Sequence, residues 1–379
     1  MFPVKNFKRN IYKFFRQPFY GMKVFLKRVK AALYYKLGRG QAPLPEAVTL
    51  FLTRRCNLKC KMCGQWGDQG VTKKGNKIQP DMPLKKLREV ILTLAEFRPS
   101  ITLFGGEPLL YTEIEEIIKL IKRNQLHCVM ITNGYLLEKY ARIITSEELD
   151  ELNISIDGPK KVHDKIRGIN GLYSKIEEGI KAVHNLKKGK KPLINLQTTI
   201  TKYNINDIVD MLNVAEEFKA DSITFHHLIF LDKEDIKNTE ARFPSLGCKD
   251  WEGFVFKPGI EPGKLSDIIG EINDKAKNRP FSVNVYPNFS PKEIEQYYRD
   301  RKYFPKSYSG RCKSSWLCAY VFPDGELRPC LNFKYSFGNL KNEKFEDVWN
   351  SEKAVKFRKM LTDNCRFPVC SRCTEIFRY

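Results

Sequence analysis

The first 45 residues of this 379-residue chain contain no aspartate or glutamate. Nowhere does the chain have the roughly 20 consecutive apolar residues that a membrane-spanning helix requires. Basic residues interrupt every apolar stretch near the amino terminus, so the sequence predicts no secretory signal. These absences predict a cytoplasmic protein, either soluble or bound peripherally to the cytoplasmic face of the membrane.

Cysteine, by contrast, is abundant, with eleven residues in the chain. Domains that are cross-linked by many disulfides are typical of secreted proteins, whereas thiols in a reducing cytoplasm stay available as metal ligands. Because no secretory signal is present, we expect most of these cysteines to bind metal rather than each other.

The positive charge is concentrated at the amino terminus. Half of the net charge of +22 lies in residues 1–45, which contain eleven lysines and arginines. Apolar residues in this segment recur at helical spacing, with most of the basic residues on the other side, so we predict a basic helical N-terminal extension. The apolar positions are Met22, Phe25, Leu26, Val29, Leu33 and Leu37, preceded by a shorter stripe of Phe7, Ile11, Phe14 and Phe15.

A basic amphipathic helix rich in aromatic residues is typical of segments that bind anionic membrane surfaces. Residues 1–40 have this composition, and we favour membrane contact. The first alternative is a helix that packs its apolar stripe on the body of the protein and leaves its lysines in solvent. Attraction to an acidic substrate or to nucleic acid is the remaining alternative, with nucleic acid the least favoured.

From residue 46 to residue 230, short apolar runs alternate with amphipathic helical patterns. Near-continuous apolar strands indicate a parallel sheet that is covered by helices. The predicted strands are Val48–Leu52, Ile101–Phe104, Cys128–Thr132, Leu152–Ile156, Leu193–Thr199 and Ile223–Phe230. The predicted helices lie near residues 83–97, 112–124, 136–145, 173–188 and 205–218. Six strand–helix units predict an α/β fold, namely a partial (βα)6 barrel of the TIM type.

Three cysteines follow the first predicted strand in the pattern C-x3-C-x2-C, at Cys56, Cys60 and Cys63. Three thiolates on one loop can hold three irons of a [4Fe–4S] cluster and leave the fourth iron open to a ligand. A closed structural zinc site requires four ligands, so this loop alone suits zinc poorly. The spacing therefore favours a catalytic iron–sulfur cluster.

Further special residues follow the next predicted strands, at the edge where the chemistry of such barrels lies. Gly105 and Gly106 let the backbone approach a ligand closely, and Glu107 places a carboxylate beside it. The segments that end the third and fourth predicted strands are Thr132–Gly134 and Ser155–Gly158.

Together these motifs resemble the radical S-adenosylmethionine (SAM) superfamily. The resemblance implies that the open iron binds SAM and that an electron from the cluster cleaves it to a 5′-deoxyadenosyl radical. It further implies that Met62 lies near the adenine, that Glu107 accepts hydrogen bonds from the amino group, and that Arg167 pairs with the methionine carboxylate. The SAM-binding residues implied in this way are Met62, Gly105, Gly106, Glu107, Pro108, Asn133, Ser155, Asp157 and Arg167.

Six further cysteines form two groups near the carboxyl terminus, namely Cys312, Cys318, Cys330, Cys365, Cys370 and Cys373. The first group, with Gly325 in a predicted hairpin turn, resembles the opening of the SPASM module, which carries auxiliary iron–sulfur clusters. The predicted helix Phe345–Met360 also resembles that module. The second group has fewer cysteines than a full SPASM module, so the module here is shortened or twitch-like.

This second resemblance implies at least one auxiliary [4Fe–4S] cluster. We expect Cys312, Cys318, Cys330 and one of the last three cysteines to hold it. A second cluster would have an incomplete set of thiolates. Six soft thiolates would also accept zinc, which is the alternative metal.

The predicted domain organisation has four parts. Residues 1–45 form the basic extension, residues 46–230 the partial barrel, residues 231–310 a connecting and substrate-covering segment, and residues 311–379 the cysteine-rich module. Within the connecting segment, a helix is predicted near residues 264–277 and a short strand at residues 281–286.

The resemblance implies an enzyme that cleaves SAM reductively and then abstracts a hydrogen atom from its substrate. A peptide or protein is the expected substrate, and a membrane lipid, a lipid-linked saccharide or a sugar is the alternative. Flavodoxin or ferredoxin is the expected reductant. A non-catalytic iron–sulfur or zinc protein that binds nucleic acid is the alternative of another class. No catalytic acid or base is assigned. His226 and His227 in the region of the sixth strand are expected to be core residues, and the alternative is that one of them faces the adenine or the substrate.

Overall fold

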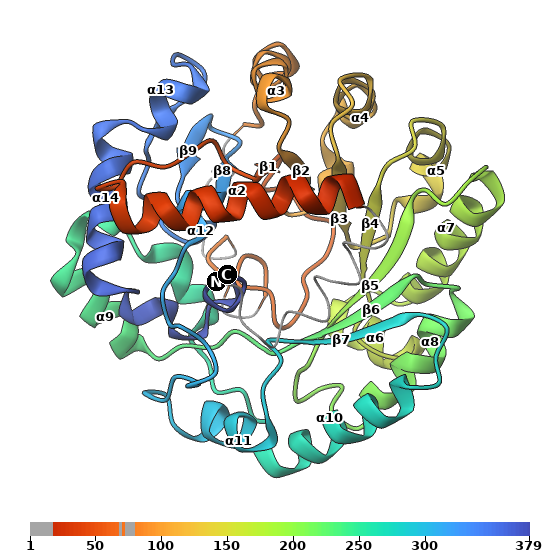
Figure 1. Cartoon of the computed structure of the whole chain (residues 1–379). Coiled ribbons are helices and arrows are strands. Elements are labelled where there is room, and N and C mark those ends of the chain that lie inside the picture. The colour runs from red at the N-terminus through yellow and green to blue at the C-terminus, as the bar shows by residue number, and fades with distance from the viewer. Residues whose placement is uncertain (1–17, 68–69, 73–79) are drawn as a thin grey trace.

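The computed structural model describes residues 18–67, 70–72 and 80–379, so the shorter predicted stripe of Phe7, Ile11, Phe14 and Phe15 lies outside the described residues. Within them, ten strands form one sheet in the order β10-β9-β8-β1-β2-β3-β4-β5-β6-β7 (Figure 1). The strands are β1 (Ala47–Phe51), β2 (Ser100–Phe104), β3 (Cys128–Thr132), β4 (Glu151–Ser155), β5 (Leu193–Thr199), β6 (Ser222–His226), β7 (Ser282–Tyr286), β8 (Cys318–Val321), β9 (Glu326–Arg328) and β10 (Gly338–Asn339).

Strands β1 to β7 pair in parallel, each with its successor in the chain. Strand β8 pairs in parallel with the other side of β1 and then turns back through the antiparallel strands β9 and β10. Val48 and Leu50 of β1 and Ile101 and Leu103 of β2 are buried, as expected for a sheet that helices cover.

The main helices that connect successive parallel strands lie in an arc around the outside of the sheet (Figure 1). They are α3 (Leu84–Phe97), α4 (Ile114–Arg123), α5 (Leu137–Ser146), α7 (Leu172–Leu186) and α8 (Met211–Glu217). In α4 the buried side chains Ile114, Ile117, Ile118 and Ile121 recur at helical spacing, and this apolar face explains why the helix packs on the sheet.

The remaining elements lie at the ends and in the connections. The α-helices are α2 (Pro18–Leu37), α6 (Lys160–Arg167), α9 (Lys233–Arg242), α10 (Pro262–Ala276), α11 (Pro291–Arg299), α12 (Ser314–Leu317), α13 (Phe345–Trp349) and α14 (Glu352–Asn364). Short 3-10 helices cover Pro108–Leu110, Ile208–Asp210, Pro244–Leu246, Lys249–Phe254, Pro368–Arg372 and Thr374–Phe377. No helix of the described chain is both long and apolar enough to cross a bilayer.

The mixed α/β fold with its parallel sheet confirms the predicted class, and three details differ. The sixth strand ends at His226 rather than at Phe230. The short strand predicted in the connecting segment is β7, which joins the main sheet as a seventh parallel strand. The predicted helix Phe345–Met360 is two helices, because Asn350 exchanges two hydrogen bonds of 3.0 Å with the backbone of Ala42 at the break between them.

Arg358 of α14 joins the cysteine-rich module to the segment that precedes β1. Its buried guanidinium donates to the carbonyl oxygens of Ser315 and Trp349 at 2.8 Å and of Gly40 at 3.3 Å, and to Asn350 Oδ1 at 3.0 Å. The guanidinium also lies 4.4 Å from the centre of the Trp349 ring. This cation is held by neutral acceptors, so burial lowers the pKa of Arg358 to about 9.

We predict that Arg358→Met lowers the free energy of unfolding by about 3 kcal/mol, because four buried acceptors lose their donor while only a desolvation cost is relieved. Lys356→Met on the exposed side of the same helix is the matched control and should change stability by less than about 0.5 kcal/mol. Denaturant titration of both variants measures the difference. Equal stabilities would contradict a joining role for Arg358.

Candidate functional site

A cavity of about 400 Å³ opens where β1 to β6 end, and the predicted cysteine loop forms part of its wall. Most of its lining residues come from the ends of these strands and from the segments that follow them, as the parallel topology requires. Predicted site residues in the wall are Cys56, Cys60, Met62, Cys63, Gly105, Gly106, Glu107, Asn133, Ser155 and Arg167.

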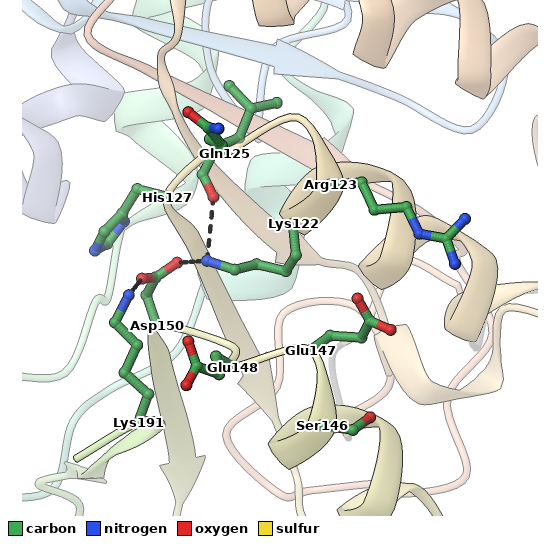
Figure 2. Close-up of a pocket in the computed structure, with 10 residues that line it drawn as sticks. Lys122, Arg123, Gln125, His127, Ser146, Glu147, Glu148, Asp150 and Lys191 are labelled. Atoms are coloured by element: carbon green, nitrogen blue, oxygen red, sulfur yellow. Dashed lines mark hydrogen bonds and ion pairs between the residues drawn. The ribbon is translucent and has the colours of Figure 1, made fainter. Parts of the chain in front are cut away.

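A second pocket, of about 510 Å³, lies at the opposite, amino-terminal ends of β3 and β4. Figure 2 shows that Asp150 sits at its centre between Lys122 and Lys191. Burial would raise the pKa of Asp150, but His127 and the two lysines together lower it. Since these charges already pair with one another, we interpret this pocket as a structural ion cluster.

The thiols of the cysteine loop are desolvated. Burial raises the pKa of Cys56 to about 12 and raises that of Cys60 as well, although the nearby Arg167 opposes the shift at Cys60. Arg167 Nη1 donates to Cys60 Sγ at 3.7 Å. A bound metal cation would reverse these shifts, because thiolates are the form that ligates metal.

Two glycines bring the end of β2 into contact with the backbone that leads into the cysteine loop. Gly106 N donates to Thr53 O at 2.8 Å, and Glu107 N donates to Arg55 O at 2.9 Å. A Cβ atom at position 106 would lie 2.3 Å from Arg55 O, which is too close for any side chain. Glycine is therefore required here so that the cysteine loop and Glu107 can share one wall of the cavity.

Glu107 is a buried carboxyl group held by three donors. Its Oε1 accepts hydrogen bonds from Thr132 Oγ1 at 2.8 Å and Leu109 N at 3.1 Å, and its Oε2 accepts one from Asn133 N at 2.7 Å. Burial raises the pKa of Glu107 to about 7, although these hydrogen bonds lower it. A cationic ligand in the cavity would therefore meet an oriented carboxylate.

Arg167, at the end of α6, is the cation of the cavity wall, and it already has an acidic partner. Asp157 is fully buried and contacts the guanidinium at 2.6 Å, while Thr199 N donates to the other carboxylate oxygen at 2.9 Å. Burial alone would lower the pKa of Arg167, but Asp157 raises it. The ion pair with Asp157 thus fixes the position of the Arg167 guanidinium in the cavity wall.

Two more of the predicted SAM-binding residues lie next to the motifs already described. Pro108 begins the buried 3-10 turn Pro108–Leu110, and Asn133 Nδ2 donates to Asn57 Oδ1 at 2.9 Å in the cysteine loop. His226 lines the cavity and shares a 2.7 Å hydrogen bond with Gln197, so it has the cavity-facing position given as the alternative rather than the core position. The available indication for it was its place at the end of the sixth strand.

His227 is buried, as expected, but it also contributes to the cavity wall. Its Nδ1 lies 3.1 Å from Tyr298 Oη, and its Nε2 has no hydrogen-bond partner in the described part of the chain. Burial lowers the pKa of His227 to about 3, so the ring is neutral at physiological pH. Sequence reasoning also missed Phe254, which comes from the connecting segment.

In the cysteine-rich module, several thiols influence one another electrostatically. Burial, followed by Cys373, Cys312 and Cys330, raises the pKa of Cys370 well above its usual value. Burial raises the pKa of Cys312 to about 12 and that of Cys330 to about 11. Cys330 and Cys318 also raise the pKa of Cys312, so the thiols of Cys312, Cys318, Cys330, Cys370 and Cys373 are neighbours in the fold.

The thiol of Cys318 and the backbone of Cys365 make further contacts within the module. The Cys318 thiol lies 3.0 Å from Tyr379 Oη, and Cys365 O accepts a hydrogen bond from Cys312 N at 3.0 Å. All eleven cysteines are free thiols.

Across residues 18–67, 70–72 and 80–379, no three His, Cys, Asp or Glu side chains are close enough to share a single metal ion. The ligands of a zinc ion all meet at one atom, whereas the thiolates of a [4Fe–4S] cluster bind separate irons and stand farther apart.

Comparisons with known proteins agree with this geometry. A family model described as the radical SAM superfamily matches residues 50–215, and one described as an iron–sulfur cluster-binding domain matches residues 312–374. The chain is 27% identical to the Fe-coproporphyrin III synthase of Methanosarcina barkeri, over 93% of this chain and 89% of that protein. It is 34% identical to the probable GTP 3′,8-cyclase of Methanococcus maripaludis, over 56% of this chain and 73% of that protein.

The fold also resembles that of a solved structure, Streptococcus suis SuiB bound to S-adenosylmethionine. The TM-score is 0.62 at 14% sequence identity, and the likeness covers 92% of this chain and 76% of that chain. At 14% identity, this likeness shows a shared fold alone.

We predict that Gly106→Ala lowers the free energy of unfolding by about 2 kcal/mol, because the new Cβ displaces Arg55 O and the chain leading to Cys56. Iron retained after anaerobic reconstitution should fall as well. Gly270→Ala in α10 is the control, because a Cβ there meets open space. Unchanged iron content in the Gly106 variant would show that the contact does not position the loop.

Proposed function

The chain belongs to the radical SAM superfamily, and we propose that it is an enzyme that removes a hydrogen atom from an organic substrate held in the cavity beside Cys56, Cys60 and Cys63. The two family matches imply a [4Fe–4S] cluster with SAM and an auxiliary iron–sulfur cluster. The observation that carries the proposal is that three thiols, one carboxyl group and one guanidinium open on a single cavity. This arrangement favours an enzyme over a non-catalytic nucleic-acid-binding protein.

In this proposal Cys56, Cys60 and Cys63 hold the first cluster, and the residues around them bind SAM. When bound, the cluster and SAM supply an organic radical that can take hydrogen from an unactivated C–H bond. Glu107 accepts hydrogen bonds from the amino group of the ligand, whose positive charge favours the ionised carboxylate. Arg167, held by Asp157, offers its remaining donors to a carboxylate.

The cavity wall beyond these polar groups is largely apolar. Phe104, Ile131, Ile229 and Phe254 all contribute to it. Such side chains exclude water, which protects a reactive intermediate from side reactions. His226 and His227 line the cavity at the end of the sixth strand, and they are our candidates for contacts with the substrate.

For the auxiliary cluster we propose Cys312, Cys330, Cys370 and Cys373 as the four ligands. Their mutual effects on pKa values support this set. Cys318, which the sequence placed in the set, also affects the pKa of Cys312, and its thiol lies 3.0 Å from Tyr379 Oη, so it is the alternative ligand. When bound, a cluster held by these four thiolates could take the second electron of a net two-electron oxidation, the first being lost with the hydrogen atom that the organic radical removes.

Two substrate classes have support. The match to the Fe-coproporphyrin III synthase extends along most of both chains and supports a porphyrin as the first substrate to test. A peptide or protein, the class expected from the sequence, is the second candidate. In either case we propose a cytoplasmic enzyme that receives electrons from a flavodoxin or ferredoxin.

We predict that the reconstituted, chemically reduced enzyme releases 5′-deoxyadenosine from SAM and that Cys60→Ala reduces the release to background. Cys128→Ala is the matched control, since this buried thiol lies in β3 at the opposite end of the sheet. Chromatographic quantification of 5′-deoxyadenosine measures both. Absence of release from the wild type, with iron loading verified, would reject the proposed function.

The proposed auxiliary ligands make a second prediction. The wild type should bind about eight irons after reconstitution, and the Cys370→Ala/Cys373→Ala variant about four. Cys318→Ala/Cys365→Ala, which removes two thiols from the same module, should keep the wild-type iron content. If this second variant loses the iron instead, the ligand set expected from the sequence is favoured.

A further inference from the structure

Helix α2 turns its apolar side away from the protein. The apolar stripe predicted from the sequence is 43% to 76% exposed, and it comprises Met22, Phe25, Leu26, Val29, Leu33 and Leu37. Positions 22 to 37 span about 22 Å of helix. The stripe is thus a continuous apolar band on the surface, contrary to the alternative in which it packs on the body of the protein.

The opposite side of α2 is held by polar contacts. Arg28 Nε and Nη2 each donate to a carboxylate oxygen of Glu46 at 2.8 Å, and Glu46 is buried. Lys27 Nζ donates to Phe97 O at 3.3 Å. Tyr35 packs edge-on against Trp316, with ring centres 4.8 Å apart.

These contacts fix how the helix is rotated. Rolling the apolar stripe inward would break the pair between Arg28 and Glu46 and leave a buried carboxylate without its cationic partner, which is strongly unfavourable. The outward orientation of the stripe is therefore built into the structure. In Figure 1, α2 lies lengthwise across the face of the molecule, so the stripe can lie parallel to a flat surface.

The charges beside the stripe indicate what kind of surface it fits. Lys30, Lys36 and Arg39 are exposed near it, and residues 1–45 contain no acidic residue. A second copy of this chain would bring the same positive charges face to face. An anionic lipid surface would instead pair with these cations while its acyl chains accept the apolar side chains.

We infer that α2 binds the surface of an anionic membrane, lying in the interface with the apolar stripe inserted among the lipids. Its polar side remains bound to Glu46 and to the segment before β1, so the body of the enzyme is held against the bilayer. The inference stands apart from the proposed reaction, since it depends on α2 and on none of the cavity residues.

Sedimentation of the full-length, cluster-loaded protein with vesicles tests this inference. We expect pelleting with vesicles of phosphatidylcholine and phosphatidylglycerol that weakens with salt, and much less with phosphatidylcholine alone. Leu26→Glu/Leu33→Glu should lower the partition coefficient at least about tenfold, because two charges enter the inserted face. Leu92→Glu/Leu186→Glu is the matched control, with leucines of similar exposure on α3 and α7.

Equal pelleting of the two double variants, or no pelleting of the wild type, would overturn the inference. A wild-type dimer that Leu26→Glu/Leu33→Glu converts to a monomer would also overturn it, by assigning the stripe to a second copy. Release of 5′-deoxyadenosine should be the same in both double variants. A failure of membrane binding is therefore distinguishable from a failure of the proposed reaction.

Discussion

The parallel pairing of β1 with both β2 and β8 is the constraint on which the rest of the site depends. Phe51 at the end of β1 lies opposite Phe104 at the end of β2, so the cysteine loop and Glu107 leave the sheet side by side. On the other side of β1, Ala47 lies opposite Cys318, where the cysteine-rich module enters the sheet. One strand thus fixes the relation between the cavity and the module.

The parallel strands and the residues at their ends could be predicted because each depends on local patterns. A buried parallel strand is a short apolar run, and Cys56, Glu107 and Asn133 directly follow such runs. The seventh strand was predicted as a strand but not as part of the sheet, since its sequence does not say with which strand Ser282–Tyr286 pairs. Likewise, the partner of Arg167 is Asp157, a contact that only the folded chain reveals.

The contacts of the carboxyl-terminal cysteines likewise could not be predicted from the sequence alone. The resemblance to the SPASM module placed Cys318 beside Cys312 and Cys330 in the expected ligand set. In the fold, Cys318 is the first residue of β8, and its thiol meets Tyr379, whose hydroxyl also lies 3.4 Å from Glu46. Glu46 in turn holds Arg28 of α2. A long-range network therefore links Cys318 to the amino-terminal helix, and no spacing rule could have indicated it.

Burial of the thiols links cluster binding to protonation. Because the pKa values of Cys56, Cys312 and Cys330 are raised to about 11 or 12, these groups are neutral at physiological pH without metal, and burying them costs little. Ligation needs thiolates, so loading of the clusters must release protons and becomes more favourable as the pH rises. The same low-polarity surroundings that keep the free thiols neutral then strengthen the attraction between thiolate and iron, since a low effective dielectric screens it less. The desolvation that raises the pKa values is thus also what allows a bound cluster to be held firmly.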